Sequence, residues 1–433
     1  MSPNTAAILG LVFLFLLMAF GIPVSFAMIL AGFLGSAYLI SIDAAIYVLA
    51  TNVWDQFSSY GLSVIPLFVL MGQIAYHSGI TERLYNAAYT WVGRLPGGLA
   101  STTILASAGF ASICGSNSAT TATMGTIALP EMKRYKYNQA LSTGSVAIGG
   151  TLGVVIPPSV VLIIIAVQTK QSIIQLFIAN IVPGVILTGL FLATVFWLCI
   201  RNPGLGPPGP RTGMREKLLS LSGVVETMIL FLLVIGGLYA GWFTPTEAGA
   251  AGSFGALVIG VARGKLSFKQ FVRAIAETIR ISSMVVLLIA GAVIFGRFLT
   301  VSRLPFELAD WVVSLNVPRA AVLLVVLMIY LIGGCFVDAM GFLVVTIPIF
   351  FPLAEALGYD PVWYTVMITL VTTMGAVTPP VGVNVYIVSA LTPDVNIGTI
   401  FRGISLFLVA YAVCLVLLII FPELALYLPR TML

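Results

Sequence analysis

Two stretches of this chain carry the same interruption inside long apolar runs: residues 150–159 read GTLGVVIPPS, and residues 375–382 read GAVTPPVG. Proline lacks a backbone N–H, and its ring clashes with the preceding turn, so an α-helix does not run unbroken through a Pro-Pro pair. The two runs are therefore predicted to be broken helices, at about 138–168 and about 361–392.

The composition identifies lipid as the solvent of these runs. Of 433 residues, 60% are hydrophobic and only 8% are charged, whereas about a quarter of the residues in a soluble domain are charged. Further apolar runs lie at 5–20, 24–40, 62–79, 174–200, 218–241, 246–262, 283–301 and 399–425. At roughly 20 residues per crossing, the chain is predicted to be an all-α integral membrane protein with about ten transmembrane helices.

Two other apolar runs are interrupted near their middle, by residues 114–118 and by residues 333–338. We interpret them as re-entrant helical hairpins, at about 97–134 and about 318–356, each preceded by an amphipathic stretch that suits the membrane interface (80–94 and 303–315). Threading them instead as full spans adds two crossings each and leaves every connection on the same side. The charge pattern therefore does not decide between these two readings.

Lysine and arginine set the predicted orientation. The linker 203–217 carries Arg211, Arg215 and Lys217, and most other basic residues fall on the same side in the predicted threading. Cytoplasmic loops of membrane proteins are enriched in Lys and Arg. We therefore predict a cytoplasmic linker, with both termini periplasmic.

The chain repeats itself at a shift of 222 positions. The matched pairs are Pro130 with Pro352, Tyr137 with Tyr359, Gly153 with Gly375, Pro157-Pro158 with Pro379-Pro380, and Ser116 with Asp338. Matched prolines and glycines at a fixed shift indicate an internal repeat. We predict a first repeat at 1–202 and a second at 218–428. Each contains an odd number of crossings, so the two copies face opposite ways, as in transporters built from inverted repeats.

Interrupted helices expose backbone groups that lipid cannot satisfy, so such backbone persists only where protein or a water-filled cavity surrounds it. The matched breaks therefore predict a cavity. Carbonyls freed near glycine and proline, together with hydroxyl and amide oxygens, suit a loosely held Na⁺. Helix N-termini at the same breaks present N–H groups to an anion.

Three features have two readings each. Asp338 is a cation ligand or orienting acceptor, or simply the N-cap of the second hairpin helix; both can hold together. Arg297 pairs with a substrate carboxylate, or it snorkels to the outer interface. The Ser/Thr-rich residues 116–121 form a binding site, or they form a packing interface between helices.

The sequence lacks the motifs of ATP hydrolysis, metal centres and enzyme catalysis. The sequence has no P-loop for direct ATP use, no His-Glu-x-x-His, one histidine, and four cysteines without paired ligand spacing. No intramembrane base accompanies Ser116 or Ser118. We therefore do not expect an enzyme. We interpret the net charge of +5 as a sign of orientation in the membrane and not of nucleic-acid binding.

Four segments together resemble the large, DctM-like membrane subunit of tripartite ATP-independent periplasmic (TRAP) transporters: residues 115–120, 150–159, 243–248 and 375–382. The broken helices are also similar to those of the wider ion transporter superfamily of sodium–dicarboxylate symporters. The resemblance implies an elevator-type transporter in a bacterial inner membrane that imports small organic anions with Na⁺ as the coupling ion and no other cofactor. The anions would be C4-dicarboxylates, sialic acids or related carboxylates.

The resemblance also implies partners and residue roles. A periplasmic substrate-binding protein would deliver the anion, and a four-helix small membrane subunit would be a separate polypeptide, because the first 20 residues here already form a span. The implied sodium ligands are Ser116, Asn117, Gly153, Ile156 and Pro158 at one site, and Asp338, Gly375 and Thr378 at the other. The implied substrate-binding residues are Ser118, Thr120, Ser159, Ala339, Pro380 and Arg297.

Two alternatives stay open at this point. A stand-alone sodium-coupled dicarboxylate symporter or antiporter of the same superfamily would need no binding protein. An intramembrane enzyme or an ion channel would belong to another class. Because Ser116-Asn117-Ser118 has Asp338-Ala339-Met340 as its counterpart, the two cation sites are expected to differ in chemistry.

Overall fold

The computed structural model describes residues 2–209, 212–315 and 317–432. Over these ranges the chain is helical, without a β-strand. Eight helices in them are long and apolar enough to cross a membrane: Tyr60–His77, Gln139–Thr169, Ile173–Arg201, Met214–Tyr239, Phe268–Ser302, Arg319–Phe336, Ala339–Ala356 and Ile397–Ile420. The all-α membrane class is thus confirmed, while the count of about ten crossings stays a prediction. Arg211, assigned above to the cytoplasmic linker, lies outside the described residues.

The part of the chain before the linker forms ten α-helices in its described residues. They are α1 (Pro3–Ala19), α2 (Val24–Leu39), α3 (Ile42–Phe57), α4 (Val64–His77), α5 (Ile80–Val92), α6 (Gly98–Cys114), α7 (Asn117–Arg134), α8 (Gln139–Val155), α9 (Val160–Thr169) and α10 (Ile173–Arg201), with the 3₁₀ turns η1 (Tyr60–Ser63) and η2 (Pro203–Leu205).

The part after the linker continues from α11 to α21. Its helices are α11 (Met214–Phe231), the π-helical η3 (Leu232–Gly236), α12 (Gly237–Tyr239), α13 (Pro245–Ala262), α14 (Phe268–Ser302), α15 (Leu304–Ser314), α16 (Arg319–Phe336), α17 (Ala339–Ala356), α18 (Pro361–Gly375), α19 (Val383–Leu391), α20 (Ile397–Ile420) and α21 (Glu423–Arg430).

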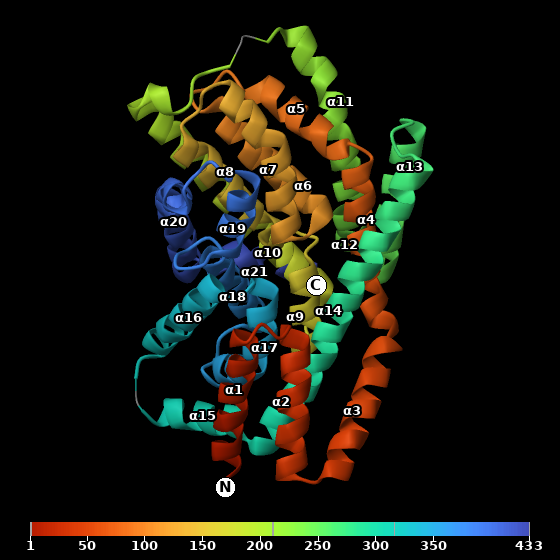
Figure 1. The fold of residues 1–433 in the computed structure, drawn as a ribbon, viewed down its shortest axis with the longest axis vertical. Coiled ribbons are helices and arrows are strands. Elements are labelled where there is room, and N and C mark those ends of the chain that lie inside the picture. Colours follow the sequence, from red (N-terminus) through yellow and green to blue (C-terminus); the bar gives the residue numbers. More distant parts are fainter. Residues whose placement is uncertain (1, 210–211, 316, 433) are drawn as a thin grey trace.

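Several helix boundaries recur at the shift found in the sequence. Both boundaries of α17 lie 222 positions after those of α7, and α18 begins 222 positions after α8. Figure 1 places α5 and α15, which precede the two hairpins, at opposite ends of the long axis of the molecule. The assignment of the halves as inverted repeats stays a prediction.

Three elements differ from the sequence prediction. Helix α3 was not among the predicted runs, because Asp43, Asn52 and Asp55 dilute its apolar character. The predicted span 283–301 is only the second part of α14, which has 35 residues and is therefore about 52 Å long. Its first part carries charged residues that hid the helix from a hydropathy reading. Helix α21 follows α20 as a separate short helix.

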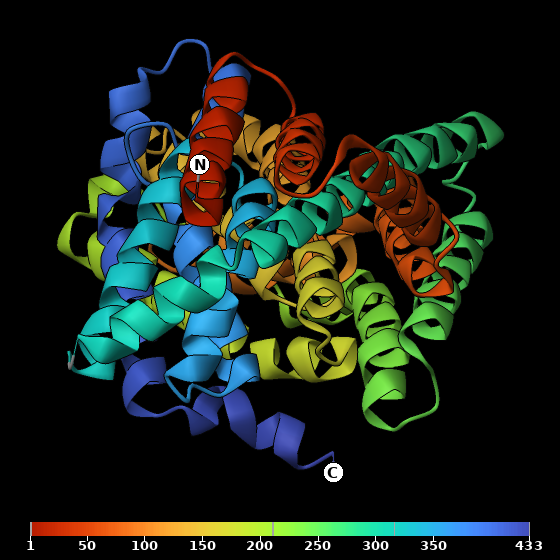
Figure 2. The same cartoon turned by 90° about the horizontal axis from the view of Figure 1, so that it is seen from below.

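Close backbone contacts, which leave no room for a side chain, hold the helices together. A Cβ on Gly403 in α20 would lie 1.9 Å from the Ala140 carbonyl oxygen in α8. A Cβ on Gly32 in α2 would lie 2.9 Å from the Phe295 backbone in α14. Figures 1 and 2 show α8 among α6, α7 and α20, while α14 runs beside α2 and α4. We call α6–α9 and α16–α20 the hairpin group. We call α2, α4, α11, α13 and α14 the α14 group.

Helix α5 is tied to the α14 group by a buried carboxylate. Glu226 in α11 is 5% exposed. It accepts from Arg83 Nε at 3.0 Å, and its other oxygen lies 2.6 Å from Arg263 Nη2. A buried carboxylate needs such paired cations. The interfacial helix α5 is thereby anchored to α11 and to the end of α13.

Candidate functional site

The first hairpin turns at Gly115 and Ser116. Gly115 ends α6 with φ +63°, a conformation that suits glycine. Ser116 caps α7: its Oγ accepts from the Ala119 N–H at 3.4 Å, and its carbonyl oxygen accepts from the Thr120 hydroxyl at 2.7 Å. The tip is therefore held in one conformation by its own side chains.

The first broken helix lies directly against this tip. Helix α8 ends at Val155 and α9 begins at Val160, with a cis peptide bond between Pro157 and Pro158. The Val160 N–H donates to the Gly115 carbonyl oxygen at 3.3 Å. A Cβ on Gly153 would lie 2.4 Å from the Ser116 carbonyl oxygen. The structure thus brings Ser116, Thr120 and Gly153 together, with Pro158 at the same junction.

Buried polar groups at this junction lack partners among the described residues. Asn117 is 4% exposed, and its Nδ2 has no hydrogen-bond acceptor. Ser159 is fully buried with an unpaired Oγ. Ser118 and Ile156 are half-buried beside them. Unpaired buried polar groups cost about 1–3 kcal/mol each, so such a cluster is ready to bind a polar ligand.

The second hairpin turns at Asp338. Its Oδ2 accepts from the Met340 N–H at 3.1 Å, so Asp338 caps α17 at its N-terminus. This contact matches the capping reading, and the cation role stays a prediction. Asp338 is half-buried, and Ala339 is buried.

The second broken helix repeats the contact with its hairpin. Helix α18 ends at Gly375 and α19 begins at Val383, with a cis peptide bond between Pro379 and Pro380. The Gly382 N–H donates to the Cys335 carbonyl oxygen at 2.9 Å. Each hairpin therefore receives a hydrogen bond from the broken helix that follows it.

The two junctions differ in detail. A Cβ on Gly375 would meet the Leu331 carbonyl oxygen at 2.6 Å and Gly334 at 2.8 Å, in the arm α16 and not at the tip. Thr378 donates to the Met374 carbonyl oxygen at 2.8 Å, within its own helix turn. No described contact joins Asp338 to Gly375 or Thr378. Pro380 is exposed, whereas Pro158 is buried.

Sequence reasoning missed Asn384, which connects the two junctions. This residue of α19 is fully buried. Its Nδ2 donates to the Ala147 carbonyl oxygen in α8 at 3.0 Å and to Asn117 Oδ1 at 3.5 Å. The signal was available as a lone amide within an apolar segment, where polar residues join helices. The repeat comparison concealed it, because its counterpart at the shift of 222 is Leu162.

Arg297 lies apart from this cluster. It is exposed on α14, and its neighbour Gly296 faces Pro348 within α17. No described interaction joins Arg297 to either hairpin tip. No described contact therefore favours a substrate-binding role for Arg297 over snorkelling to the membrane interface.

The donors at the junctions are neutral oxygens and one carboxylate. Among the described residues no three of His, Cys, Asp and Glu converge as a metal site would require. Carbonyl, hydroxyl and amide oxygens are hard ligands that suit alkali and alkaline-earth cations. The N-termini of α7 and α17 add N–H groups that favour an anion.

Known proteins resemble this chain in sequence and in fold. Residues 11–424 match the family model described as "Tripartite ATP-independent periplasmic transporter, DctM component". The C4-dicarboxylate TRAP transporter large permease protein DctM of Pseudomonas aeruginosa is 36% identical over 88% of this chain and 89% of its own length. The sialic acid TRAP transporter large permease protein SiaM of Vibrio cholerae is 32% identical over 95% of each chain.

A solved membrane transporter shares the fold at low identity. The YdaH transporter of Alcanivorax borkumensis superposes with a TM-score of 0.63 at 16% identity, over 89% of this chain and 91% of that one. This likeness concerns architecture alone. The family match and the relatives concern sequence, and they extend over nearly the whole chain. The chain belongs to the DctM component family of TRAP transporters, as a multi-pass inner-membrane large permease subunit.

Proposed function

We propose that this subunit imports a small organic anion together with Na⁺. The observation that carries the proposal is the contact of each hairpin with the break in the following helix: Val160 bonds to Gly115 at the first tip, and Gly382 bonds to Cys335 near the end of α16. Discontinuous helices at such positions bind substrates and coupling ions in secondary transporters. Two of them, joined by Asn384, create one polar region inside an apolar protein.

The first sodium site is proposed at Ser116, Asn117, Gly153, Ile156 and Pro158. Gly153 allows α8 to approach the Ser116 carbonyl oxygen closely, so backbone oxygens from tip and break can converge on one cation. The second site is proposed at Asp338, Gly375 and Thr378. At this second site Gly375 lies against α16 and not against the hairpin tip.

The substrate is proposed to bind between the two tips. Ser118, Thr120, Ser159, Ala339 and Pro380 would contact it, and the N-termini of α7 and α17 would attract its carboxylate. The named substrates of the two relatives above, a C4-dicarboxylate and sialic acid, are both carboxylates. Arg297 remains a candidate for a second carboxylate contact.

The mechanism is proposed to be an elevator, in which the hairpin group moves against the α14 group. A small membrane subunit and a periplasmic binding protein would complete the transporter, as the family name implies. Both termini are proposed to be periplasmic, which fits the basic linker on the cytoplasmic side.

Reconstitution tests the proposal. The subunit and its small partner are placed in liposomes with radiolabelled succinate or sialic acid outside, with or without the binding protein, and with an inward Na⁺ or K⁺ gradient. We expect saturable uptake that requires Na⁺ and the binding protein. Uptake without the binding protein would instead favour a stand-alone symporter. Flux that does not saturate would favour a channel, and turnover of the substrate in detergent would favour an enzyme.

A further inference from the structure

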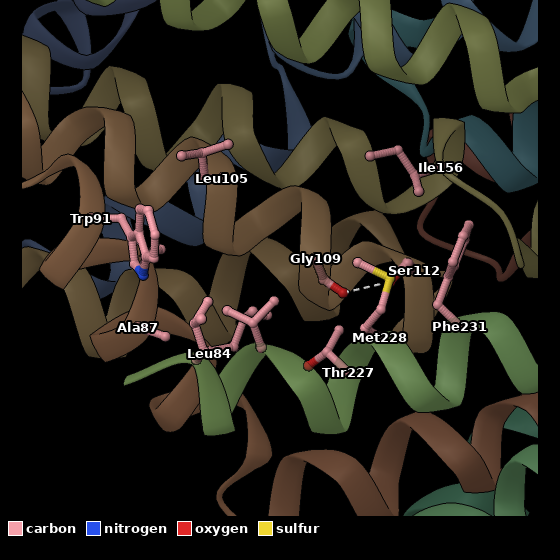
Figure 3. Close-up of a pocket in the computed structure, with 13 residues that line it drawn as sticks. Leu84, Ala87, Trp91, Leu105, Gly109, Ser112, Ile156, Thr227, Met228 and Phe231 are labelled. Atoms are coloured by element: carbon pink, nitrogen blue, oxygen red, sulfur yellow. Dashed lines mark hydrogen bonds between the residues drawn. The ribbon is translucent and has the colours of Figure 1, made fainter. Parts of the chain in front are cut away.

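A large cavity lies between α5, α6 and α11. Its volume is about 490 Å³, and Figure 3 shows side chains from these helices around it. Its lining includes Ala88 and Trp91 of α5, Ser112 of α6, Ile156, and Thr227 and Phe231 of α11. The cavity therefore separates part of the hairpin group from α11 in the α14 group.

The walls of the cavity are mostly apolar. Ser112 and Thr227 are the polar side chains in the lining: the Ser112 hydroxyl donates to the Gly109 carbonyl oxygen at 2.7 Å, and the Thr227 hydroxyl has no partner among the described residues. Water needs two to four polar partners in a buried site, and apolar cavities stay dry. A carboxylate would lose its hydration without compensation. A hydrocarbon chain fits such a lining, whereas a carboxylate does not.

One end of the cavity has the features of a membrane surface. Trp91 is 43% exposed there, and the Lys217 ammonium lies 5.7 Å from the centre of its ring. Tryptophan gathers at the level of lipid headgroups, and a lysine near the cytoplasmic surface attracts anionic ones. The charge at this end is thus complementary to an acidic lipid headgroup.

The other end lies against the first broken helix. Ile156, which directly follows α8, lines the cavity together with Phe231, and Figure 3 shows the two on the side away from Trp91. From Lys217 to Phe231, α11 rises roughly 21 Å. This length suits a lipid tail that starts at the surface and ends beside the break.

We propose that this cavity binds one acyl chain of an anionic phospholipid, with its headgroup beside Lys217 and its tail against Ile156. One lining residue, Ile156, also belongs to the proposed first sodium site, whereas the other lining residues belong to none of the sites proposed above. The lipid would fill the space between the hairpin group and α11, and so would contact both of the groups that an elevator moves.

Quenching of Trp91 fluorescence tests this site. The full chain, with its small partner where the two copurify, is reconstituted with phosphatidylglycerol or phosphatidylcholine that carries brominated acyl chains, at equal bromine content. The Trp91 signal is the difference from Trp91→Phe, since the chain has six tryptophans. We expect stronger quenching in phosphatidylglycerol. Lys217→Glu should reduce that preference about fivefold, as expected for a basic residue near an anionic surface.

Matched variants separate the cavity from the general lipid surface. Ala88→Phe fills the cavity and should reduce the lipid dependence of the signal, whereas Ala250→Phe on the exposed face of α13 and Lys269→Glu on α14 should not. Native mass spectrometry should find one phospholipid retained by the unmodified chain and lost in Ala88→Phe. Equal quenching in both lipids, or a retained polypeptide in place of the lipid, would overturn the proposal.

Discussion

At the scale of single residues, Gly153 is the position where the first broken helix approaches the first hairpin tip closely. A Cβ there would meet the Ser116 carbonyl oxygen at 2.4 Å and the Thr120 hydroxyl at 2.7 Å. Overpacking of this kind costs about 1–3 kcal/mol and would separate tip from break. We expect Gly153→Ala to lower Na⁺-driven uptake at least about tenfold, measured in proteoliposomes. Gly189→Ala on α10, with nothing near its added methyl, is the control and should transport normally.

A single substitution separates the two interpretations of Asp338, as a cation ligand or only as the N-cap of α17. Asparagine caps a helix about as well as aspartate does, so Asp338→Asn preserves the hydrogen bond to Met340 while removing the charge. We expect an unchanged melting temperature and a several-fold rise in the Na⁺ concentration that gives half-maximal uptake. An unaltered sodium response would leave Asp338 with capping as its only role.

At the scale of elements, Asn384 connects α19 to the first hairpin and to α8. Replacing it by alanine leaves the Ala147 carbonyl oxygen without its described side-chain donor, at a cost of about 1–3 kcal/mol. We expect Asn384→Ala to weaken Na⁺ and substrate dependence together, in parallel uptake titrations. Asn180→Ala is the matched control, since Asn180 is equally buried but bonds only within its own helix, to Leu176. Equal effects of the two variants would refute the coupling.

The end of α7 and the loop before α20 are joined by an exposed ion pair. The Lys133 ammonium donates to Asp394 at 2.7 Å, and this hydrogen bond lowers the pKa of Asp394 below its ordinary value of 3.8. Because the folded-state pKa is depressed, the pair stabilises the fold at neutral pH, and its contribution is lost as the pH falls through that lowered pKa.

Thermal unfolding as a function of pH measures this contribution. We expect Asp394→Asn to melt slightly below the unmodified protein at pH 7, and the difference to disappear at strongly acidic pH. The effect is small because both side chains are exposed. A difference that persists undiminished in acid would point to another cause.

The positions of many helices could be predicted from the sequence. A Pro-Pro pair interrupts an α-helix, and the pairs at 157–158 and 379–380 lie between α8 and α9 and between α18 and α19. Helix α3 and the first part of α14 were missed, because their charged residues interrupt the apolar pattern. The position of Gly375 against α16, and the contacts of Asn384, depend on packing between distant segments that local sequence patterns do not encode.

At the scale of the whole molecule, the elevator proposal requires α17 to move past α14. A Cβ on Gly296 would lie 3.7 Å from Pro348 Cβ, which is within the range for a disulfide. We expect Gly296→Cys with Pro348→Cys to stop uptake on oxidation and to recover it on reduction. The single variants Gly296→Cys and Pro348→Cys are the controls and should keep their uptake after oxidation. Uptake that survives the crosslink would argue against relative movement here.

The contact of Gly403 with Ala140 also constrains how the protein is made. Helix α8 leaves the ribosome about 260 residues before the segment of α20 that covers it, an interval of roughly 13–50 s at ordinary rates of synthesis. Until then the face of α8 around Ala140 lacks the packing partner that Gly403 supplies. The packing of the hairpin group is therefore completed only near the end of translation.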